Sequence, residues 1–306
     1  MAVLTSISQE ALAAVDQRAV GFRQTARELV SLTKPRITLM VVLTAAGGMW
    51  LAPAAAAPVT IAVALGALAM VVSGANALNC WLERDSDRLM RRTAVRSLPA
   101  KRLSPTPALL FGLALGFGAV PILWLAVNPL TALLGALSLF IYVCIYTPMK
   151  QMTWVALLIG AVPGAMPPLM GWTAVTGSID LPGLVLFGVM FIWQIPHFLA
   201  IATFRREEYE AAGLVVLPSV HGDRAARYHA LFWTALLLPV SLALTFLGVA
   251  GWFYFAAALV MGGHFFYTAV VAVRSPTDDT KWSRRVFFSS IAYLPVVFAI
   301  MMADAG

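Results

Sequence analysis

Charged residues are scarce in this chain. They make up 11% of the 306 residues, whereas hydrophobic residues make up 60%. This balance excludes an ordinary water-soluble domain, because mostly apolar runs long enough to cross a bilayer recur along the sequence. We therefore predict an all-α integral membrane protein with nine spans. The predicted spans are residues 37–54, 59–82, 107–127, 130–146, 154–175, 181–204, 228–249, 252–273 and 286–302.

Cysteine and flexible linkers are also nearly absent. The two cysteines, Cys80 and Cys144, form no CxxC motif and no disulfide framework, so we expect both to be small apolar fillers. No Gly/Ser-rich or low-complexity block interrupts the spans. We therefore predict one transmembrane domain at residues 34–306.

Residues 1–33 lack the continuous apolar stretch of a signal peptide. Their apolar residues instead recur at spacings of three and four, which predicts an amphipathic helix lying on the membrane surface. A loosely ordered tail is the alternative. The predicted apolar stripe consists of Leu12, Val15, Ala19, Phe22, Ala26 and Leu29.

Basic residues are missing from every second loop. All 21 Lys and Arg residues precede the first span or lie in alternate loops. The positive-inside rule places the N-terminus and these loops in the cytoplasm, and nine spans then place residues 303–306 outside. Anionic lipid accounts for the net charge of +7, so we expect the bilayer and no nucleic acid as a partner. The basic loops are residues 83–102, 150, 205–227 and 274–285.

Acidic residues number only 14, and three of them follow the second span directly. Asn79, Glu83 and Asp87 are spaced four residues apart, so on a helix they stack on one face over roughly 12 Å. Like charges in contact are unfavourable unless a cation lies between them. Oxygen ligands suit Mg²⁺, which commonly bridges carboxylates to substrate phosphates. This pattern predicts a metal and diphosphate site at the membrane surface.

Basic residues follow the acid stack. Arg92 and Arg96 could share a helix face and neutralise phosphate oxygens, and Lys150 is the single charge of a short loop on the same side. A positive loop with internal salt bridges is the simpler alternative for each of them.

A second acidic loop lies four spans later and contains Glu207, Glu208 and Tyr209. Adjacent residues cannot share a helix face, so we expect one of the two glutamates to point toward the first motif, as a ligand of a second metal ion or a partner of the diphosphate. Tyr209 is a substrate-binding candidate. A solvated loop is the alternative. The spacing of the two acidic loops hints at two similar halves facing each other across a cavity.

The sixth span contains Trp193, Gln194 and His197. An ionisable side chain inside a membrane indicates function by default, and His can ligate an iron, bind a carboxylate or move a proton. A hydrogen-bonded structural histidine is the alternative. Prolines in residues 163–168 can break or kink the fifth span, either to shape a chamber or for packing.

These motifs resemble the UbiA superfamily of membrane prenyltransferases, over about residues 31–299. The Asn-acid motif is typical of the whole superfamily, whereas Pro-Pro-Leu-x-Gly-Trp and Trp-Gln-x-Pro-His-Phe are similar to its haem-modifying branch. Glu83, Glu207 and Glu208 stand where that family more often has Asp, and Ser97 replaces a usual Pro. The stretches that carry the resemblance are residues 33–36, 79–96, 164–172, 193–198 and 209–218.

The resemblance implies nine helices around a central cavity in a bacterial inner membrane. It implies Mg²⁺-dependent transfer of a farnesyl group from farnesyl diphosphate to a vinyl group of haem b, with addition of water. Asn79, Glu83 and Asp87 would form the first metal and diphosphate motif, with Arg92, Arg96 and Lys150 as diphosphate partners. Glu207 and Glu208 would be the second acidic motif. A downstream haem-modifying enzyme or terminal oxidase would receive the product.

Two other functions remain open at this point. A related prenyltransferase would act on an aromatic quinone precursor, and a non-catalytic carrier or transporter would bind haem or an anionic lipid. Of the 14 acidic residues, only Asp180 and Asp304 lie in segments predicted to be outside. This one-sided distribution disfavours a transporter, which commonly needs polar groups deep in its spans or at both ends.

Overall fold

The computed structural model describes residues 21, 23–275 and 281–305, and in them the chain is helical with no strand. Within these residues, eight helices are long and apolar enough to cross a membrane, and the number rises to nine if Arg23–Leu32 and Pro35–Leu51, which meet at a bend of 49°, count as one span. The nine predicted spans each correspond to a crossing in this set. Of the predicted N-terminal stripe, Leu12, Val15, Ala19 and Phe22 lie outside the described residues.

Prolines start many of these helices, because a proline at the first turn lacks an N–H that would be unpaired there anyway. In chain order the elements are α2 (Pro35–Leu51), α3 (Pro58–Leu82), η1 (Ser86–Leu89), α4 (Pro105–Ala126), α5 (Pro129–Phe140), η2 (Ile141–Tyr146), α6 (Thr147–Met149), α7 (Ala156–Thr176), α8 (Leu181–Phe204), α9 (Arg206–Ala211), α10 (Leu217–Phe246), α11 (Trp252–Arg274) and α12 (Lys281–Ala303).

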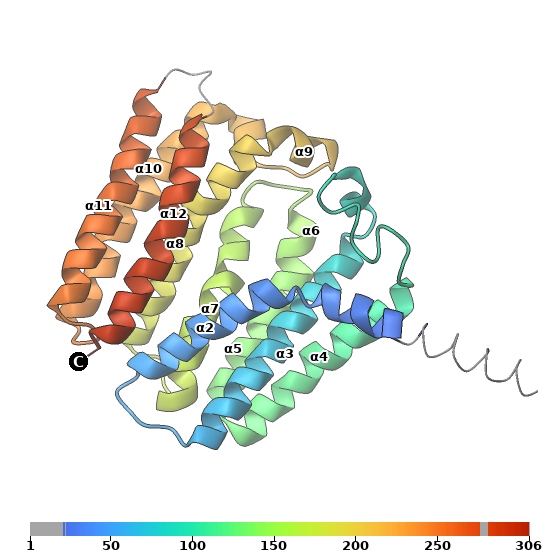
Figure 1. Ribbon diagram of the computed structural model, residues 1–306, viewed down its shortest axis with the longest axis horizontal. Coiled ribbons are helices and arrows are strands. Elements are labelled where there is room, and N and C mark those ends of the chain that lie inside the picture. Colours follow the sequence, from blue (N-terminus) through green and yellow to red (C-terminus); the bar gives the residue numbers. More distant parts are fainter. Residues whose placement is uncertain (1–20, 22, 276–280, 306) are drawn as a thin grey trace, which may run out of the picture.

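The helices pack around two hydrophobic cores. One core joins α8, α10, α11 and α12, and the other joins α2, α3, α4 and α5 (Figure 1). Helix α7 contributes Trp172 to the first core and Met170 to the second, so it lies between them. Accordingly, α7 is the most deeply buried of the candidate spans, and 67% of its most apolar 18-residue stretch is buried inside the protein.

The proline-rich segment of α7 is one continuous helix from Ala156 to Thr176, although Pro163, Pro167 and Pro168 lie inside it. The possible break at residues 163–168 therefore does not occur. A break does occur in α10, which begins eleven residues before the predicted span: Gly222 has φ 79° and ψ 170°, which interrupts the helical backbone.

Helix α2 crosses α7 at very short range (Figure 1). A Cβ on Gly171 would lie 1.9 Å from the carbonyl oxygen of Ala45, and a Cβ on Gly48 would lie 2.0 Å from that of Pro168. Both neighbours are backbone atoms and cannot rotate away. Glycine is therefore required for the two helices to touch.

The loops that carry most of the charge gather at one end of the bundle. We call this the polar end; it consists of residues 83–104, 150–155 and 205–216. The opposite end is closed partly by Asp304, whose carboxylate accepts a hydrogen bond from the amide of Tyr254 at 2.7 Å. The functional candidates thus lie at the polar end or just below it.

The close crossing of α2 and α7 predicts the effect of one methyl group. Gly171→Ala should force the helices apart and lower the free energy of unfolding by about 1–3 kcal/mol. Thermal denaturation of the detergent-solubilised protein measures this as a lower midpoint. Gly66→Ala in α3 is the matched control, because nothing lies within 4 Å of the added Cβ; equal midpoints for the two variants would contradict the prediction.

Candidate active site

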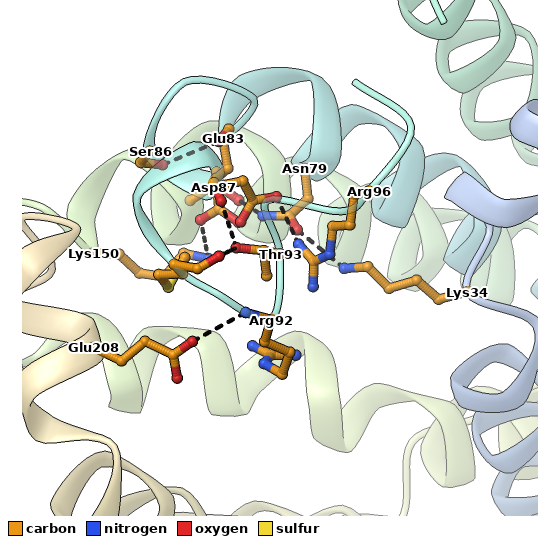
Figure 2. Close-up of polar contacts among 12 residues, drawn as sticks. Lys34, Asn79, Glu83, Ser86, Asp87, Arg92, Thr93, Arg96, Lys150 and Glu208 are labelled. Atoms are coloured by element: carbon orange, nitrogen blue, oxygen red, sulfur yellow. Dashed lines mark hydrogen bonds and ion pairs between the residues drawn. The ribbon is translucent and has the colours of Figure 1, made fainter. Parts of the chain in front are cut away.

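The acid stack forms as predicted, although the helix ends early. Helix α3 stops at Leu82, yet the amide of Glu83 still donates to the carbonyl of Asn79 at 2.9 Å, and the amide of Asp87 to that of Glu83 at 2.8 Å. This continued spacing of four keeps the three side chains on one side of the chain (Figure 2). Asp87 itself lies in the short 3-10 helix η1 and is only 1% exposed.

Each member of the stack has a cationic partner. Glu83 forms an ion pair with Lys150, and Oδ2 of Asp87 accepts a hydrogen bond from Nη1 of Arg96 at 2.7 Å. Oδ1 of Asn79 accepts one from Nζ of Lys34 at 3.2 Å (Figure 2). The structure therefore brings together five of the predicted residues. Such pairing is what makes burial of a carboxylate tolerable.

Lys34 was not assigned a role from the sequence. Its backbone is left-handed, with φ 49° and ψ 65°, at the bend between Arg23–Leu32 and α2. This conformation is unfavourable for a residue with a side chain, and it persists only where the surroundings hold it. A basic residue directly before Pro35, at the mouth of the first span, was the signal that could have indicated it.

Lys150 is positioned by a π-helical segment, η2, which is followed at once by α6. Its Nζ lies 4.7 Å from the centre of the Tyr146 ring. Burial alone lowers the pKa of Lys150, but Tyr146 and Glu83 outweigh it and raise this pKa above its ordinary value. The ammonium group therefore stays charged. The Tyr146 ring fits against α7 because Gly160 leaves space there; a Cβ would lie 2.4 Å from it.

Thr147 ties the lysine loop to the acid stack. Its hydroxyl accepts a hydrogen bond from Nδ2 of Asn79 at 3.2 Å and donates one to the carbonyl of Tyr142 at 2.8 Å. These contacts fix the orientation of the Asn79 amide, with its oxygen toward Lys34.

The second acidic loop meets the first through Glu208. Its Oε1 accepts a hydrogen bond from the amide of Arg92 at 3.3 Å, and its Oε2 one from Nη1 of Arg205 at 2.9 Å. Burial raises the pKa of Glu208, but these hydrogen bonds outweigh it and hold the pKa below its usual value. Glu207 is exposed. Of the two adjacent glutamates, Glu208 is thus the one that faces the first motif.

The remaining candidates of the polar end are arranged less closely. Arg92 and Arg96 do not share a helix face, because residues 91–100 form turns instead of a helix; Arg96 turns toward Asp87, while Arg92 is exposed. Burial raises the pKa of Tyr209, so its phenol stays protonated near Arg92 and Tyr146.

The predicted metal ligands are only partly gathered. In the described part of the chain, no group of three or more His, Cys, Asp or Glu side chains lies close enough to hold a metal ion. One buried oxygen does suit a cation: Oδ1 of Asp87 has no hydrogen-bond partner. Together with Glu83 and Asn79 it forms a small set of oxygen donors. This set fits Mg²⁺, which takes few protein ligands and completes its shell with phosphate and water.

His197 lies below the polar end between two aromatic rings. Its ring stacks on Trp193 at 5.1 Å and on Phe287 at 5.0 Å. Its Nδ1 lies 2.7 Å from the hydroxyl of Ser290, and that hydroxyl donates to the carbonyl of Phe287 at 2.6 Å. Nδ1 must therefore carry the proton in this bond, which leaves a lone pair on Nε2.

Gln194 lies on another face of α8. It is 5% exposed, and its amide donates to the carbonyls of Ala161 and Met190 at 2.8 and 3.1 Å. The bond to Ala161 joins α8 to α7, whereas Met190 lies on α8 itself, so the structure favours a packing role for Gln194 over contact with a substrate. Trp193 faces α12, where its Nε1 donates to the carbonyl of Ser290 at 2.9 Å.

The described part of the N-terminal segment is docked on the polar end. Leu29 and Leu32 pack against Cys80 and Leu98, so this face is buried in protein. Nearby, the Ser97 hydroxyl donates to a carboxylate oxygen of Glu28 at 2.6 Å. Ser97 thus holds the helix that precedes α2 against the loop containing Asp87.

Known proteins resemble this chain along most of its length. The model of the UbiA prenyltransferase family matches residues 41–291. A protoheme IX farnesyltransferase of Sorangium cellulosum is 50% identical over 87% of this chain and 100% of its own length. The enzyme of that name from Myxococcus xanthus is 46% identical over 95% and 98%.

Solved structures share the fold at low identity. A digeranylgeranylglyceryl phosphate synthase has a TM-score of 0.80 at 14% identity, covering 92% of this chain and 98% of its own. A UbiA homologue from Archaeoglobus fulgidus bound to DMAPP and Mg²⁺ has a TM-score of 0.63 at 16% identity, covering 90% and 99%.

The described residues thus form an apolar helical bundle with paired carboxylates and cations at one end. The chain belongs to the UbiA prenyltransferase family.

The contact between the two acidic loops predicts a pH dependence. The folded-state pKa of Glu208 is depressed, so its stabilising contact is present above the ordinary glutamate pKa and is lost as pH falls through the lower folded value. The hydrogen-exchange protection of the Arg92 amide measures this contact directly. Glu208→Gln should lower the protection of this amide at neutral pH by about five-fold.

Glu207→Gln is the matched control, because Glu207 is exposed on the adjacent position. Protection at Arg92 should stay at the wild-type level in this control. Equal protection in both variants at every pH would show that the Glu208 carboxylate does not hold the first loop.

Proposed function

We propose that this protein transfers a farnesyl group from farnesyl diphosphate to a vinyl group of haem b, with addition of water, giving haem O and diphosphate. The observation that carries this proposal is the close similarity to protoheme IX farnesyltransferases along nearly the whole chain. The polar end supplies groups that suit the diphosphate, and His197 is available for the porphyrin. Haem and farnesyl diphosphate are the substrates.

The diphosphate would bind between the acid stack and its cations. Lys150, Arg96 and Lys34 already converge there from three separate segments, held by Glu83, Asp87 and Asn79. They can turn their positive charge to phosphate oxygens with little movement. Charge that develops on the departing diphosphate is stabilised by such preorganised donors. The exposed Arg92 and the phenol of Tyr209 would close the site from the side of the second loop.

Asp87, Glu83 and Asn79 would hold Mg²⁺ on the substrate. When bound, Mg²⁺ neutralises the diphosphate and makes it a better leaving group. Asp87 is best placed for this role, because one of its buried oxygens has no other partner. Glu208 faces the same side and could approach a second ion, whereas Glu207 points to solvent.

As the bond from farnesyl C1 to oxygen loosens, positive charge develops on the allylic carbons. Tyr142 and Tyr146 would form an aromatic wall beside these carbons, because their ring centres lie 5.3 Å apart and Lys150 lies against the Tyr146 ring. Such walls exclude water that would otherwise capture the cation, and aromatic faces stabilise positive charge. The haem vinyl group then attacks C1, and water adds to the resulting cation beside the porphyrin.

His197 is the candidate contact for the haem acceptor. Its stacked, hydrogen-bonded ring is held in one orientation, with the Nε2 lone pair available to the iron or to a proton. Gln194 would support this helix from behind.

The polar end would face the cytoplasm of a bacterial inner membrane, and the C-terminus would lie outside, since the basic loops cluster at this end. The haem product would pass to a downstream haem A synthase or to terminal oxidase assembly.

The farnesyl transfer can be tested with the purified protein, haem b, farnesyl diphosphate and Mg²⁺, with products followed by mass spectrometry. The expected product is haem b plus a farnesyl group and water, and EDTA should abolish it. Asp87→Asn should lower kcat/KM by roughly 100-fold or more, because it weakens the hold on the Mg²⁺ that neutralises the leaving group. Asp85→Asn is the control, since Asp85 is an exposed neighbour paired with Arg84 and Arg88.

No mass-shifted haem under any condition would overturn the proposal. Prenylation of a phenolic acceptor alone would assign the protein to the quinone-precursor branch. Haem binding without turnover would favour a carrier.

The haem role of His197 predicts a substrate-specific defect. His197→Phe keeps an aromatic ring between Trp193 and Phe287 but removes both nitrogens, so the KM for haem should rise by roughly ten-fold while the KM for farnesyl diphosphate stays unchanged. His264→Phe on α11 is the matched control. Equal effects on both substrates would indicate a structural histidine instead.

A further inference from the structure

A groove lined by aromatic and basic side chains lies near the polar end, apart from the acid stack. It is an open groove of about 380 Å³ between the end of α8 and the start of α12. We call it the α8–α12 groove; its lining residues are Phe204, Arg205, Arg284, Phe287 and Phe288. This volume is in the range of ligand-binding clefts. None of these residues was singled out as a candidate from the sequence.

The groove combines flat aromatic walls with two positive charges. Phe287 packs edge-on against Phe204 at 5.4 Å and against Phe288 at 5.6 Å. The guanidinium of Arg205 lies 5.8 Å from the Phe204 ring. Phe288 remains 65% exposed. A complementary ligand would be flat and apolar on its faces and would carry two negative charges along one edge.

The groove connects to both halves of the proposed reaction site. Phe287, which lines it, stacks on His197 at 5.0 Å. Arg205, at its rim, forms an ion pair with Glu208, and Glu208 accepts a hydrogen bond from the backbone amide of Arg92. His197 lies eight residues before Arg205 on the same helix, roughly 12 Å deeper along its axis.

We propose that the α8–α12 groove binds the propionate edge of haem b, with Arg205 and Arg284 pairing the two carboxylates. This inference rests on the proposed function, which makes haem b a substrate. Charge complementarity favours it, because two carboxylates on one edge of a planar macrocycle match two guanidinium groups beside phenyl rings. A diphosphate would gain nothing from the aromatic walls.

The binding direction follows from the chemistry of haem. Its two vinyl groups lie on the edge opposite the propionates. With the propionates held at the polar end, the vinyl edge points into the bundle, past His197. The groove would thus determine which edge of the porphyrin enters the helical bundle.

The test compares haem b with its dimethyl ester, which lacks the two carboxylate charges. Affinities are measured from the Soret band with the full-length protein in nanodiscs of phosphatidylcholine. The wild type should prefer haem b by about ten-fold, as expected for two partly exposed ion pairs. Arg284→Gln should reduce this preference to about three-fold and leave the affinity for the ester unchanged.

Arg285→Gln is the matched control, because Arg285 is the exposed neighbour on α12 and does not line the groove. It should keep the full preference. Arg205→Gln gives a second, independent variant, with Arg206→Gln as its control. Wild-type protein that binds haem and ester equally, or Arg284→Gln that keeps the wild-type preference, would overturn the proposal.

Two further outcomes separate the possible failures. If added phosphatidylglycerol displaces haem from the wild type and Arg284→Gln removes this competition, the groove holds a lipid headgroup and the proposal is wrong. Farnesyl transfer is measured on the same preparations. Product formation without any preference for the free propionates refutes the groove alone, whereas absence of product refutes the proposed function.

Discussion

Burying acidic groups inside an apolar bundle is the constraint on which the polar end depends. A carboxylate removed from water is costly unless an opposite charge compensates it. Glu83 and Asp87 therefore each hold a cation, and the buried amide of Asn79 holds a third. The partners come from three separate segments of the chain. The same pairing that makes the acids tolerable thus gathers the positive charge that a diphosphate requires.

The two cores around α7 share this one helix. Close glycine contacts fix α2 against α7, and Gln194 joins α8 to the other side of α7. The positions of the acid stack and of His197 therefore both depend on contacts with helix α7. Its prolines do not interrupt it, and helix α7 runs continuously from Ala156 to Thr176. A buried central helix of this kind ties the helices that surround it together.

Local patterns in the sequence could predict much of this, and contacts between distant segments could not. The nine spans follow from long apolar runs, and the acid stack follows from a spacing of four that persists beyond α3. Lys34 meets Asn79 from 45 positions away, and Glu208 reaches the Arg92 amide across 116. Such pairings depend on how helices cross, which periodicity does not encode. The prediction of a helix at Arg92 was wrong, because the backbone of residues 91–100 forms turns.

The π-helical segment Ile141–Tyr146 has a consequence for how this family can vary. A π-turn contains one residue more than the α-turn it replaces. Loss of a single codon there would restore a regular α-turn and leave the segments on either side in register, whereas the same loss in the regular helix α5 would rotate everything after it by about 100°. The span would stay equally apolar and would still insert into the membrane. After a deletion in α5, however, Lys150 would turn away from Glu83, so an intact-looking membrane protein would lose its charge pairing through one deletion that no hydropathy profile would reveal, while a deletion in the π-turn would preserve the pair.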